Sequence, residues 1–221
     1  MPVTRIIAVR HGETAWNVDT RIQGHLDIPL NEQGLRQAAH LAQALAQGDT
    51  IDAIYASDLS RAHATASAIG QALGQGVTAH IGLRERHFGE FQGRTFKDIE
   101  VELPDHAWHW RKRTPDWIPP SGGESLVMLR ERILNTVNEL AAAHSGQQIV
   151  LVAHGGVLDI AAGSGNAAIP AVDSRRRVMA HLGHELCLLH RGRALHHRDG
   201  SGRDGARRSR CRRGRRRSPG P

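Results

Sequence analysis

Three short apolar runs stand out along the chain, at residues 5–9, 51–56 and 148–153. Runs of this length, rich in Val, Ile and Ala and apolar on both faces, are typical of buried strands in a parallel sheet. Two of the runs lead into a His-Gly pair, which begins at His11 in one case and at His154 in the other. We therefore expect these runs to be central strands of one sheet, with both histidines just beyond their ends.

Segments of helical character separate the runs. Residues 31–47 and 124–144 repeat apolar side chains every three or four positions, and residues 59–72 are rich in Ala, which predicts three helices. Ser121 and Glu124 have the spacing of a capping box and are expected to begin the third helix. Strands that alternate with helices of this length predict an α/β fold with a three-layer, doubly wound and mostly parallel sheet.

Several residues that are far apart in the sequence follow the carboxyl ends of the predicted strands. In doubly wound sheets, ligands bind beyond these ends. The turn after the run at 51–56 carries Arg61, and the other two runs lead to the His-Gly pairs. We therefore expect Arg10, His11, Arg61 and His154 to lie close together.

This set of residue types suits phosphoryl transfer. An arginine guanidinium binds phosphate oxygens in pairs and stays charged, and neighbouring cations keep a nucleophilic imidazole neutral. The second histidine, His154, would hydrogen-bond the oxygens on which charge develops in the transition state. Glu85 is the carboxyl we expect to protonate the leaving alkoxide. The arrangement predicts a phosphohistidine intermediate.

Longer motifs occur in order over residues 5–159. They are Arg10-His11-Gly12-Glu13-Thr14, Trp16-Asn17, Gln23-Gly24, Asp27-Ile28-Pro29-Leu30, Ser57-Asp58-Leu59-Ser60-Arg61-Ala62, Thr65-Ala66, Glu85-Arg86-His87-Phe88-Gly89-Glu90-Phe91-Gln92-Gly93, Gly122-Gly123-Glu124-Ser125 and His154-Gly155-Gly156. In these motifs the chain resembles the phosphoglycerate mutase-like branch of the histidine phosphatase superfamily.

The resemblance implies a role for each matching residue. His11 would be the phosphorylated nucleophile and Glu85 the general acid, later the base that activates water. The phosphate pocket would consist of Arg10, His11, Asn17, Gln23, Gly24, Arg61, Glu85, His154 and Gly155. Such proteins need no metal or organic cofactor, and their partner would be a small phosphorylated metabolite.

The resemblance also implies a catalytic domain over residues 1–160, in which residues 86–120 form a lid. The lid contains a basic and aromatic cluster: Trp108, Trp110, Arg111, Lys112, Arg113 and Trp117. This cluster is read either as a partly buried cap helix or as a lid that sets substrate choice. His106 and His109 have helical spacing, but no matched carboxylate accompanies them, so a solvated or lid position is favoured over a metal site.

The formal charge of +7 is unevenly placed. Residues 1–170 hold 14 Lys and Arg against 18 Asp and Glu, whereas residues 171–221 hold 15 Arg against 4 acidic residues. Only two lysines accompany 27 arginines in the whole chain, which suggests a GC-rich gene. We therefore predict that the reading frame shifts near residue 160 and that residues 161–221 form an Arg-rich, largely disordered tail.

The cysteine positions and the lengths of the apolar runs indicate where in the cell the protein is expected. Both cysteines, Cys187 and Cys211, lie near the C-terminus, so we expect no disulfide framework. No apolar run approaches the length of a membrane span, and the first residues lead directly into a strand-like run. The sequence thus favours a cytoplasmic protein with no membrane partner, and a homodimer is left open.

Four functions remain open at this point. The resemblance implies that mutases of this family carry a longer segment between Glu85 and the helix at 124–144. The shorter segment here resembles the phosphatases and favours a phosphomonoester hydrolase over the alternative, a mutase that transfers the phosphoryl group between sugar-acid phosphates. A nucleic-acid-binding protein that uses the Arg-rich tail is less favoured, because the tail lacks aromatic residues and the body is acidic. The last is a catalytically compromised member that only binds phosphorylated ligands.

Overall fold

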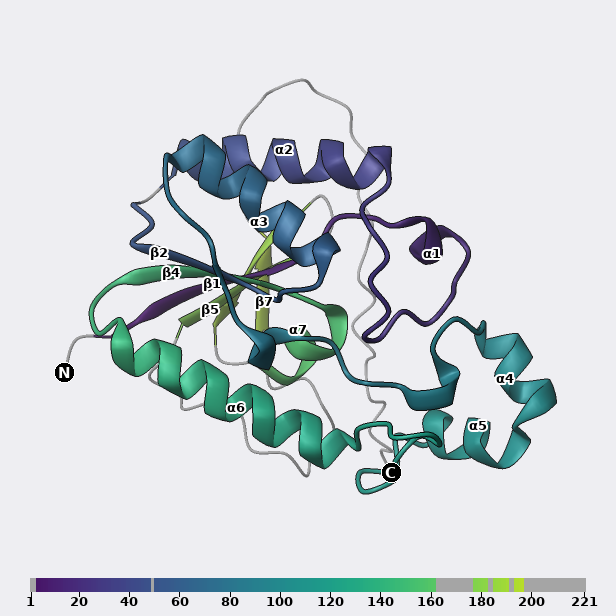
Figure 1. Ribbon diagram of the computed structural model, residues 1–221. Helices are drawn as coiled ribbons and strands as arrows, with labels where there is room; N and C mark the ends of the chain where they lie inside the picture. Colours follow the sequence, from purple (N-terminus) through teal and green to yellow (C-terminus); the bar gives the residue numbers. More distant parts are fainter. Residues whose placement is uncertain (1–2, 49, 162–176, 183–184, 191–192, 197–221) are drawn as a thin grey trace, which may run out of the picture.

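The computed structural model describes residues 3–48, 50–161, 177–182, 185–190 and 193–196. Seven strands within these residues form one sheet (Figure 1). The strands are β1 (Arg5–Arg10), β2 (Ala53–Ala56), β3 (Thr78–Ala79), β4 (Gln148–Ala153), β5 (Arg177–Leu182), β6 (Glu185–His190) and β7 (Arg193–His196). The helices are α1 (Ala15–Val18), α2 (Glu32–Ala46), α3 (Ser60–Leu73), α4 (Phe96–Glu102), α5 (Pro104–Arg111), α6 (Leu126–Ala143) and α7 (Gly155–Ala161), with short 3-10 helices η1 (Ile81–Leu83) and η2 (Gly89–Phe91).

The strand order is β3-β2-β4-β1-β5-β6-β7. All pairs from β3 to β5 are parallel, and the β5–β6 and β6–β7 pairs are antiparallel. All six residues of β4 are buried, and β1 buries its four inner residues, as expected for central strands covered on both faces. The predicted doubly wound, mostly parallel α/β sheet is confirmed.

Helices cover both faces of the sheet and divide the core in two. In Figure 1, α2 and α3 lie on one face and α6 and α7 on the other. Ile7, Val9 and Val152 point into the first core, while Ile6, Ile149 and Leu151 point into the second. Because successive strand residues face opposite sides, the apolar runs must be apolar throughout, which explains their unbroken pattern.

The third predicted helix begins later than its sequence pattern indicated. Ser125, not Ser121, caps α6 by accepting the Met128 N–H at 3.1 Å, and Ser121 lies outside the helix with φ of +60°. The capping box of Ser121 and Glu124 was therefore wrong, because Arg132 binds the Glu124 carboxylate instead. Within the described residues, no helix has the length and apolarity needed to cross a bilayer.

Three strands lie within residues 161–221, where the sequence predicted no regular structure. β5 pairs in parallel with β1, so that Arg5 aligns with Arg177 and Val9 with His181, and β6 and β7 extend this edge. The apolar segments here are short and broken by Gly and Arg, which hid their strand character. Residues 162–176 and 197–221 lie outside the described residues, so the disordered tail and the frame shift stay predictions.

The segment predicted to be a lid, residues 86–120, has a small core of its own. Phe91, Ile99 and Ala107 are fully buried there, and Trp110 and Trp117 pack against them. Trp108, by contrast, remains 51% exposed. Figure 1 shows α4 and α5 beside the main body rather than on either face of the sheet. The aromatic residues of the predicted cluster are therefore divided between a buried interior and the surface.

The loop after β1 touches the start of α2 backbone to backbone. A Cβ added at Gly34 would lie 2.1 Å from the Glu13 carbonyl oxygen, and one at Gly12 would lie 2.5 Å from the Gly34 carbonyl oxygen. Such distances leave no room for any side chain. Both glycines thus let α2 press against the loop that follows His11.

We predict that Gly34→Ala destabilises the protein although Gly34 lies in a helix. Alanine normally favours a helix by up to about 1 kcal/mol over glycine. Here the clash with backbone that cannot rotate away should dominate and lower the free energy of unfolding by about 1–3 kcal/mol. Urea unfolding measures this change. Gly48→Ala is the matched control, because its Cβ would meet nothing closer than 3.5 Å; equal stability of both variants would contradict the prediction.

Candidate active site

His11 lies directly beyond β1, with 9% of its surface exposed. Its Nδ1 is 2.7 Å from the Gly12 carbonyl oxygen. Because a carbonyl only accepts hydrogen bonds, Nδ1 carries the proton, and the Nε2 lone pair is left for chemistry. Burial lowers the pKa of His11 to about 3, opposed by the bond to Gly12 and assisted by the charges of Arg61 and Arg10. The imidazole is neutral at physiological pH.

Arg61, in the first turn of α3, is fully buried. Its guanidinium donates to the carbonyl oxygens of Leu26 at 2.9 Å and Gly24 at 2.8 Å. Burial lowers the pKa of Arg61 from its usual value, which the charges of Glu85 and Asp27 partly counteract. Since both hydrogen bonds go to neutral carbonyls, the positive charge remains available to an anion.

His154, directly beyond β4, is also fully buried, and its ring centroid lies 5.1 Å from that of His11. Neither ring nitrogen has a hydrogen-bond partner among the described residues. Burial is the main cause that lowers the pKa of His154 well below its ordinary value, and electrostatic interactions with His11 and Arg61 add to it. Two unpartnered ring nitrogens in a buried position mark this imidazole as able to contact a ligand.

Glu85 lies in the coil between η1 and η2. One carboxylate oxygen accepts the Arg86 N–H at 2.8 Å, and the other accepts the Gly156 N–H at 3.1 Å. Burial raises the pKa of the carboxyl, whereas the two backbone hydrogen bonds and the charges of Arg61 and Arg10 lower it. The burial effect is the largest, so the site favours the protonated acid more than water does.

Arg10 and Asn17 lie at the open side of the pocket. They line, with His11, a cavity of about 200 Å³ that extends toward α2. The Asn17 Oδ1 accepts hydrogen bonds from the backbone N–H and the hydroxyl of Thr14, each at 3.0 Å. The carbonyl end of the amide is thus occupied, and its N–H2 group is the end available for an anion. Arg10 is exposed, unlike Arg61.

Three further predicted residues surround this group. Gly24 has φ of +54°, and its carbonyl holds Arg61. Gln23 is buried, and its side-chain oxygen has no partner among the described residues. A Cβ added at Gly155 would lie 3.9 Å from the Arg10 guanidinium carbon. The structure therefore brings the predicted residues of four separate chain segments to one edge of the sheet.

Some residues that build the site were not assigned a role from the sequence. Thr65 of α3 accepts the Gly12 N–H at 3.0 Å and donates to the Arg61 carbonyl one turn earlier in the same helix at 2.8 Å, so it links α3 to the loop after β1. Asp27 accepts the Ser60 N–H and so caps α3 from another part of the chain. Gln92 accepts the His25 N–H beside Gly24. In the sequence, Asp27, Thr65 and Gln92 stood out only as parts of the matched motifs. Their contacts could not be inferred because they join positions far apart in the sequence.

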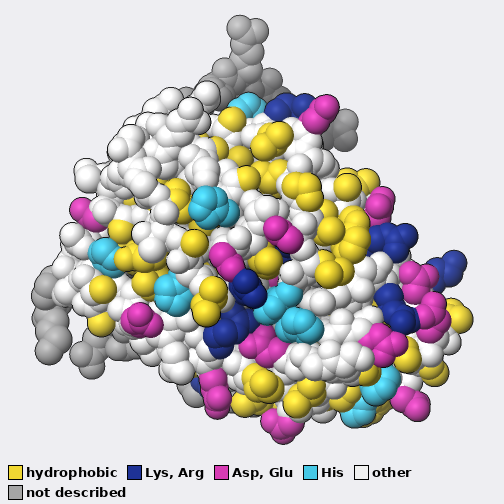
Figure 2. All heavy atoms as spheres, viewed as in Figure 1, with side chains coloured by type: hydrophobic (Ala, Val, Ile, Leu, Met, Phe, Trp, Pro, Cys, Tyr) yellow, Lys and Arg dark blue, Asp and Glu magenta, His cyan; other side chains and the backbone are white. Residues whose placement is uncertain are grey.

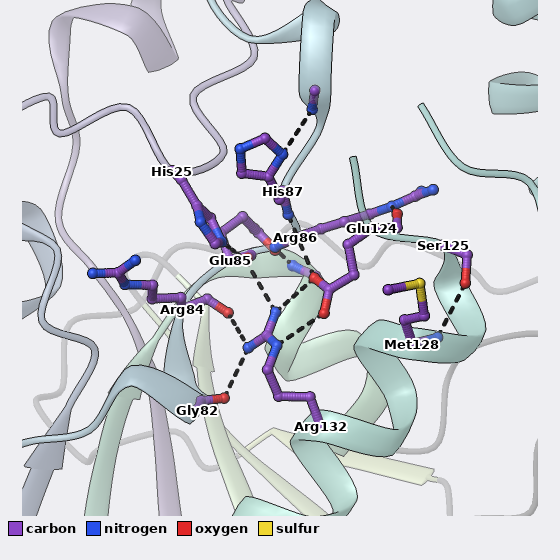
Figure 3. Close-up of polar contacts among 12 residues, drawn as sticks. His25, Gly82, Arg84, Glu85, Arg86, His87, Glu124, Ser125, Met128 and Arg132 are labelled. Carbon is purple, nitrogen blue, oxygen red and sulfur yellow. Dashed lines mark hydrogen bonds and ion pairs between the residues drawn. The ribbon is translucent and has the colours of Figure 1, made fainter. Parts of the chain in front are cut away.

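The segment that carries Glu85 is held from α6. Arg132 donates hydrogen bonds to the carbonyls of Gly82, Arg84 and Glu85, and to both carboxylate oxygens of Glu124 (Figure 3). On the opposite side, the His25 ring lies 2.8 Å from the Glu85 carbonyl oxygen and donates to it. The Glu85 backbone is therefore fixed by two side chains from distant segments.

A second cavity, of about 210 Å³, lies between the lid and the helices α6 and α7. Its wall includes Arg86, Trp110, Arg113, Trp117 and Gly156. Arg86 is 5% exposed and lies within 6 Å of three aromatic rings, and burial lowers its pKa to about 10. Since Gly156 also donates to Glu85, this cavity borders the segment that holds the candidate acid.

The lid histidines pack against an aromatic ring. The His109 ring stacks on Trp117 at 5.7 Å with an interplanar angle of 3°, and the His106 ring lies 6.0 Å from Trp117. In the part of the chain that the structure describes, no group of three or more His, Cys, Asp or Glu side chains is placed to hold a metal ion.

Figure 2 shows basic, acidic and histidine side chains close together near the middle of the face it presents.

The fold and the pocket define a class: an α/β protein with a buried neutral histidine and a buried arginine at the carboxyl ends of its central strands. The sequence-family model of the histidine phosphatase superfamily (branch 1) matches residues 6–182 of this chain. The chain belongs to this superfamily. The matched region continues past residue 160, where the sequence pattern had placed the end of the domain.

Related proteins carry both phosphatase and mutase names. The chain is 40% identical over 154 residues to phosphoglycerate mutase-like protein 4 of Arabidopsis thaliana, covering 69% of this chain and 67% of the relative. It is 38% identical over 157 residues to the metal-independent phosphoserine phosphatase of the same plant, covering 71% and 66%. A mycobacterial glucosyl-3-phosphoglycerate phosphatase, solved with VO3, is similar with a TM-score of 0.65 and 37% identity, covering 71% and 78%.

We predict a pH-dependent loss of stability caused by His11. In the unfolded chain His11 binds a proton near its ordinary pKa of 6.5, whereas in the folded protein it stays neutral to about pH 3. Stability is therefore fully present above pH 6.5 and falls as the pH drops toward 3, by about 2 kcal/mol between pH 7 and pH 5. Urea unfolding at both pH values measures this loss.

The comparison protein is His11→Gln, which has no titrating group at this position. His25 and His154 titrate in both proteins, so the difference between the two pH dependences isolates His11. If the variant loses as much stability as the parent between pH 7 and pH 5, the buried neutral state of His11 is not supported.

Proposed function

We propose that the protein hydrolyses small phosphomonoesters through a phosphohistidine on His11. The observation that carries this proposal is the buried neutral imidazole whose Nδ1 is held by the Gly12 carbonyl, beside the charged guanidinium of Arg61. Superfamily membership and the phosphatase names among the relatives support it. Nucleophile, anion site and acid are all contributed by this chain's own residues.

In the first step, Nε2 of His11 attacks phosphorus, and the bond from phosphorus to the alcohol oxygen breaks. The Glu85 carboxyl gives its proton to the leaving alkoxide. In the second step, water attacks the phosphohistidine while the Glu85 carboxylate takes its proton, which releases inorganic phosphate and restores His11. Burial supports this role, because it raises the pKa of Glu85 and so favours the protonated form that the first step requires.

The remaining residues would bind the transferred group. Arg61 and Arg10 supply fixed positive charge, and Asn17 offers its amide N–H2. His154 would donate one ring N–H to an oxygen on which charge develops, since its ring nitrogens are buried without partners among the described residues. The loop at Gln23 and Gly24 and the start of α7 at Gly155 complete the proposed pocket.

Hydrolysis is favoured over mutase transfer because the lid is short and its basic residues are only partly available. Arg111 pairs with Glu100 at 2.7 Å on the surface, which leaves Lys112 and Arg113 of the predicted cluster. A mutase must hold a second phosphate while the intermediate forms. We propose that the lid instead sets the choice of substrate, with small phosphorylated metabolites as the substrate class.

Two substrates separate the alternatives. Incubation with 3-phosphoglycerate tests for phosphoryl transfer, and incubation with 4-nitrophenyl phosphate tests for hydrolysis. We expect release of inorganic phosphate with no rapid mutase turnover. Rapid isomerisation of 3-phosphoglycerate with negligible hydrolysis would establish the mutase instead, and tight phosphate binding without either activity would establish a compromised binder.

We predict that His11→Ala lowers kcat/KM more than about 1,000-fold, because no other group can form the covalent intermediate. Brief reaction with a 32P-labelled ester followed by denaturation should label the parent protein with acid-labile phosphate and leave the variant unlabelled. His40→Ala, which alters an exposed histidine on α2, is the control and should keep both activity and label. A labelled and active His11→Ala protein would overturn the mechanism.

We predict that Gly156→Ala lowers hydrolysis about 10- to 100-fold. The new Cβ would lie 2.5 Å from a Glu85 carboxylate oxygen, so the candidate acid must move. Steady-state kinetics on an alkyl phosphate measures the loss. Gly76→Ala is the control, since nothing lies within 4 Å of its Cβ. Unchanged kinetics for Gly156→Ala would show that the position of Glu85 is not critical.

A further inference from the structure

Arg132 uses every donor it has, three on the backbone around Glu85 and two on the carboxylate of Glu124. Nε and Nη2 donate to the two carboxylate oxygens of Glu124 at 2.9 and 2.7 Å. Nη1 donates to the carbonyls of Gly82 at 2.9 Å and Arg84 at 2.8 Å, and Nη2 also donates to the Glu85 carbonyl at 3.2 Å. These bonds use all five N–H groups of the guanidinium.

Glu124 completes the arrangement on the other side of Glu85. Its backbone N–H donates to the His87 carbonyl at 2.8 Å, and its carbonyl accepts the Arg86 Nε at 2.6 Å. The His87 N–H in turn approaches its carboxylate at 3.4 Å. We call Arg132 of α6 and Glu124, which precedes α6, together the clamp. Figure 3 shows the clamp meeting the segment on both sides of Glu85.

This segment needs such support because it has no regular structure. Residues 84–88 lie between η1 and η2, so their carbonyls have no helix or strand partners. The clamp is also shielded, since the side chains of Arg132 and Glu124 are 25% and 13% exposed. Charge-assisted hydrogen bonds are stronger than neutral ones, and more so when shielded from water. A planar guanidinium is the only side chain that can reach three carbonyls and a carboxylate at once.

We propose that Arg132 is a positioning residue for Glu85. By fixing the carbonyls of residues 82, 84 and 85, it holds the carboxyl where it meets the Gly156 N–H and can protonate the leaving group. Among the described residues, the hydrogen bonds of Arg132 go to Gly82, Arg84, Glu85 and Glu124 and to none of His11, Arg61 and His154. The inference rests on the proposed role of Glu85 as the general acid.

The test compares two esters that differ in their need for an acid. 4-Nitrophenyl phosphate releases a stabilised phenolate that needs little protonation, whereas glycerol 2-phosphate releases an alkoxide that does. We expect Arg132→Lys, which keeps the charge but cannot span the carbonyls, to lower kcat/KM for glycerol 2-phosphate at least about tenfold more than for 4-nitrophenyl phosphate. Glu85→Gln should show the same selective loss.

Val137→Ala is the matched control, because it removes a buried core side chain from the same helix without touching the clamp. It should lower both activities by one factor, or neither. If Arg132→Lys also lowers both by one factor, Arg132 only stabilises the fold and the proposal is overturned. Should Arg132→Lys not fold, Glu124→Gln answers the same question with the same expected selectivity.

The proposal and the proposed function fail differently. If the parent protein hydrolyses neither ester, or if Glu85→Gln shows no preference between them, the proposed role of Glu85 fails first. If Glu85→Gln is selective and Arg132→Lys is not, the positioning role alone is refuted.

Discussion

The buried charge of Arg61 is the constraint on which the site depends. A guanidinium taken fully out of water costs several kcal/mol unless its donors are satisfied. Here two backbone carbonyls accept from Nη1 and Nη2 without neutralising the charge, and Nε has no hydrogen-bond partner among the described residues. That arrangement requires the Gly24 turn, the Asp27 cap on α3 and the Thr65 bridge to Gly12. The proposed phosphate site depends on this positive charge, which is kept unneutralised beside a neutral imidazole.

Two arginines, Arg61 fully buried and Arg132 partly buried, organise two irregular segments in the same way. Arg61 holds the carbonyls of Gly24 and Leu26, and Arg132 holds those of Gly82, Arg84 and Glu85. Except for Gly82 in η1, these positions lie outside helices and strands, and side chains from the regular helices α3 and α6 supply the missing donors. The sheet and its helices thus extend their rigidity to the loops that carry the chemistry.

The regular elements were predictable where local pattern decides them. The runs that became β1 and β4 are apolar on both faces because helices cover both, and the repeats that became α2 and α6 bury one face. The start of α6 was missed because Glu124 satisfies Arg132 rather than its own helix. The strands β5, β6 and β7 were missed because pairing with β1, rather than a long apolar pattern, places the first of them.

The sequence by itself determined the family, the central strands and the identity of the proposed reacting groups, since motifs at strand ends converge in any doubly wound sheet. Only the tertiary structure decided how those groups behave. Burial sets the neutral state of His11 and favours the protonated state of Glu85, and burial is a property of packing. The hydrogen bond from Arg132 to the Glu85 carbonyl joins positions 47 residues apart, so no local sequence pattern could reveal it.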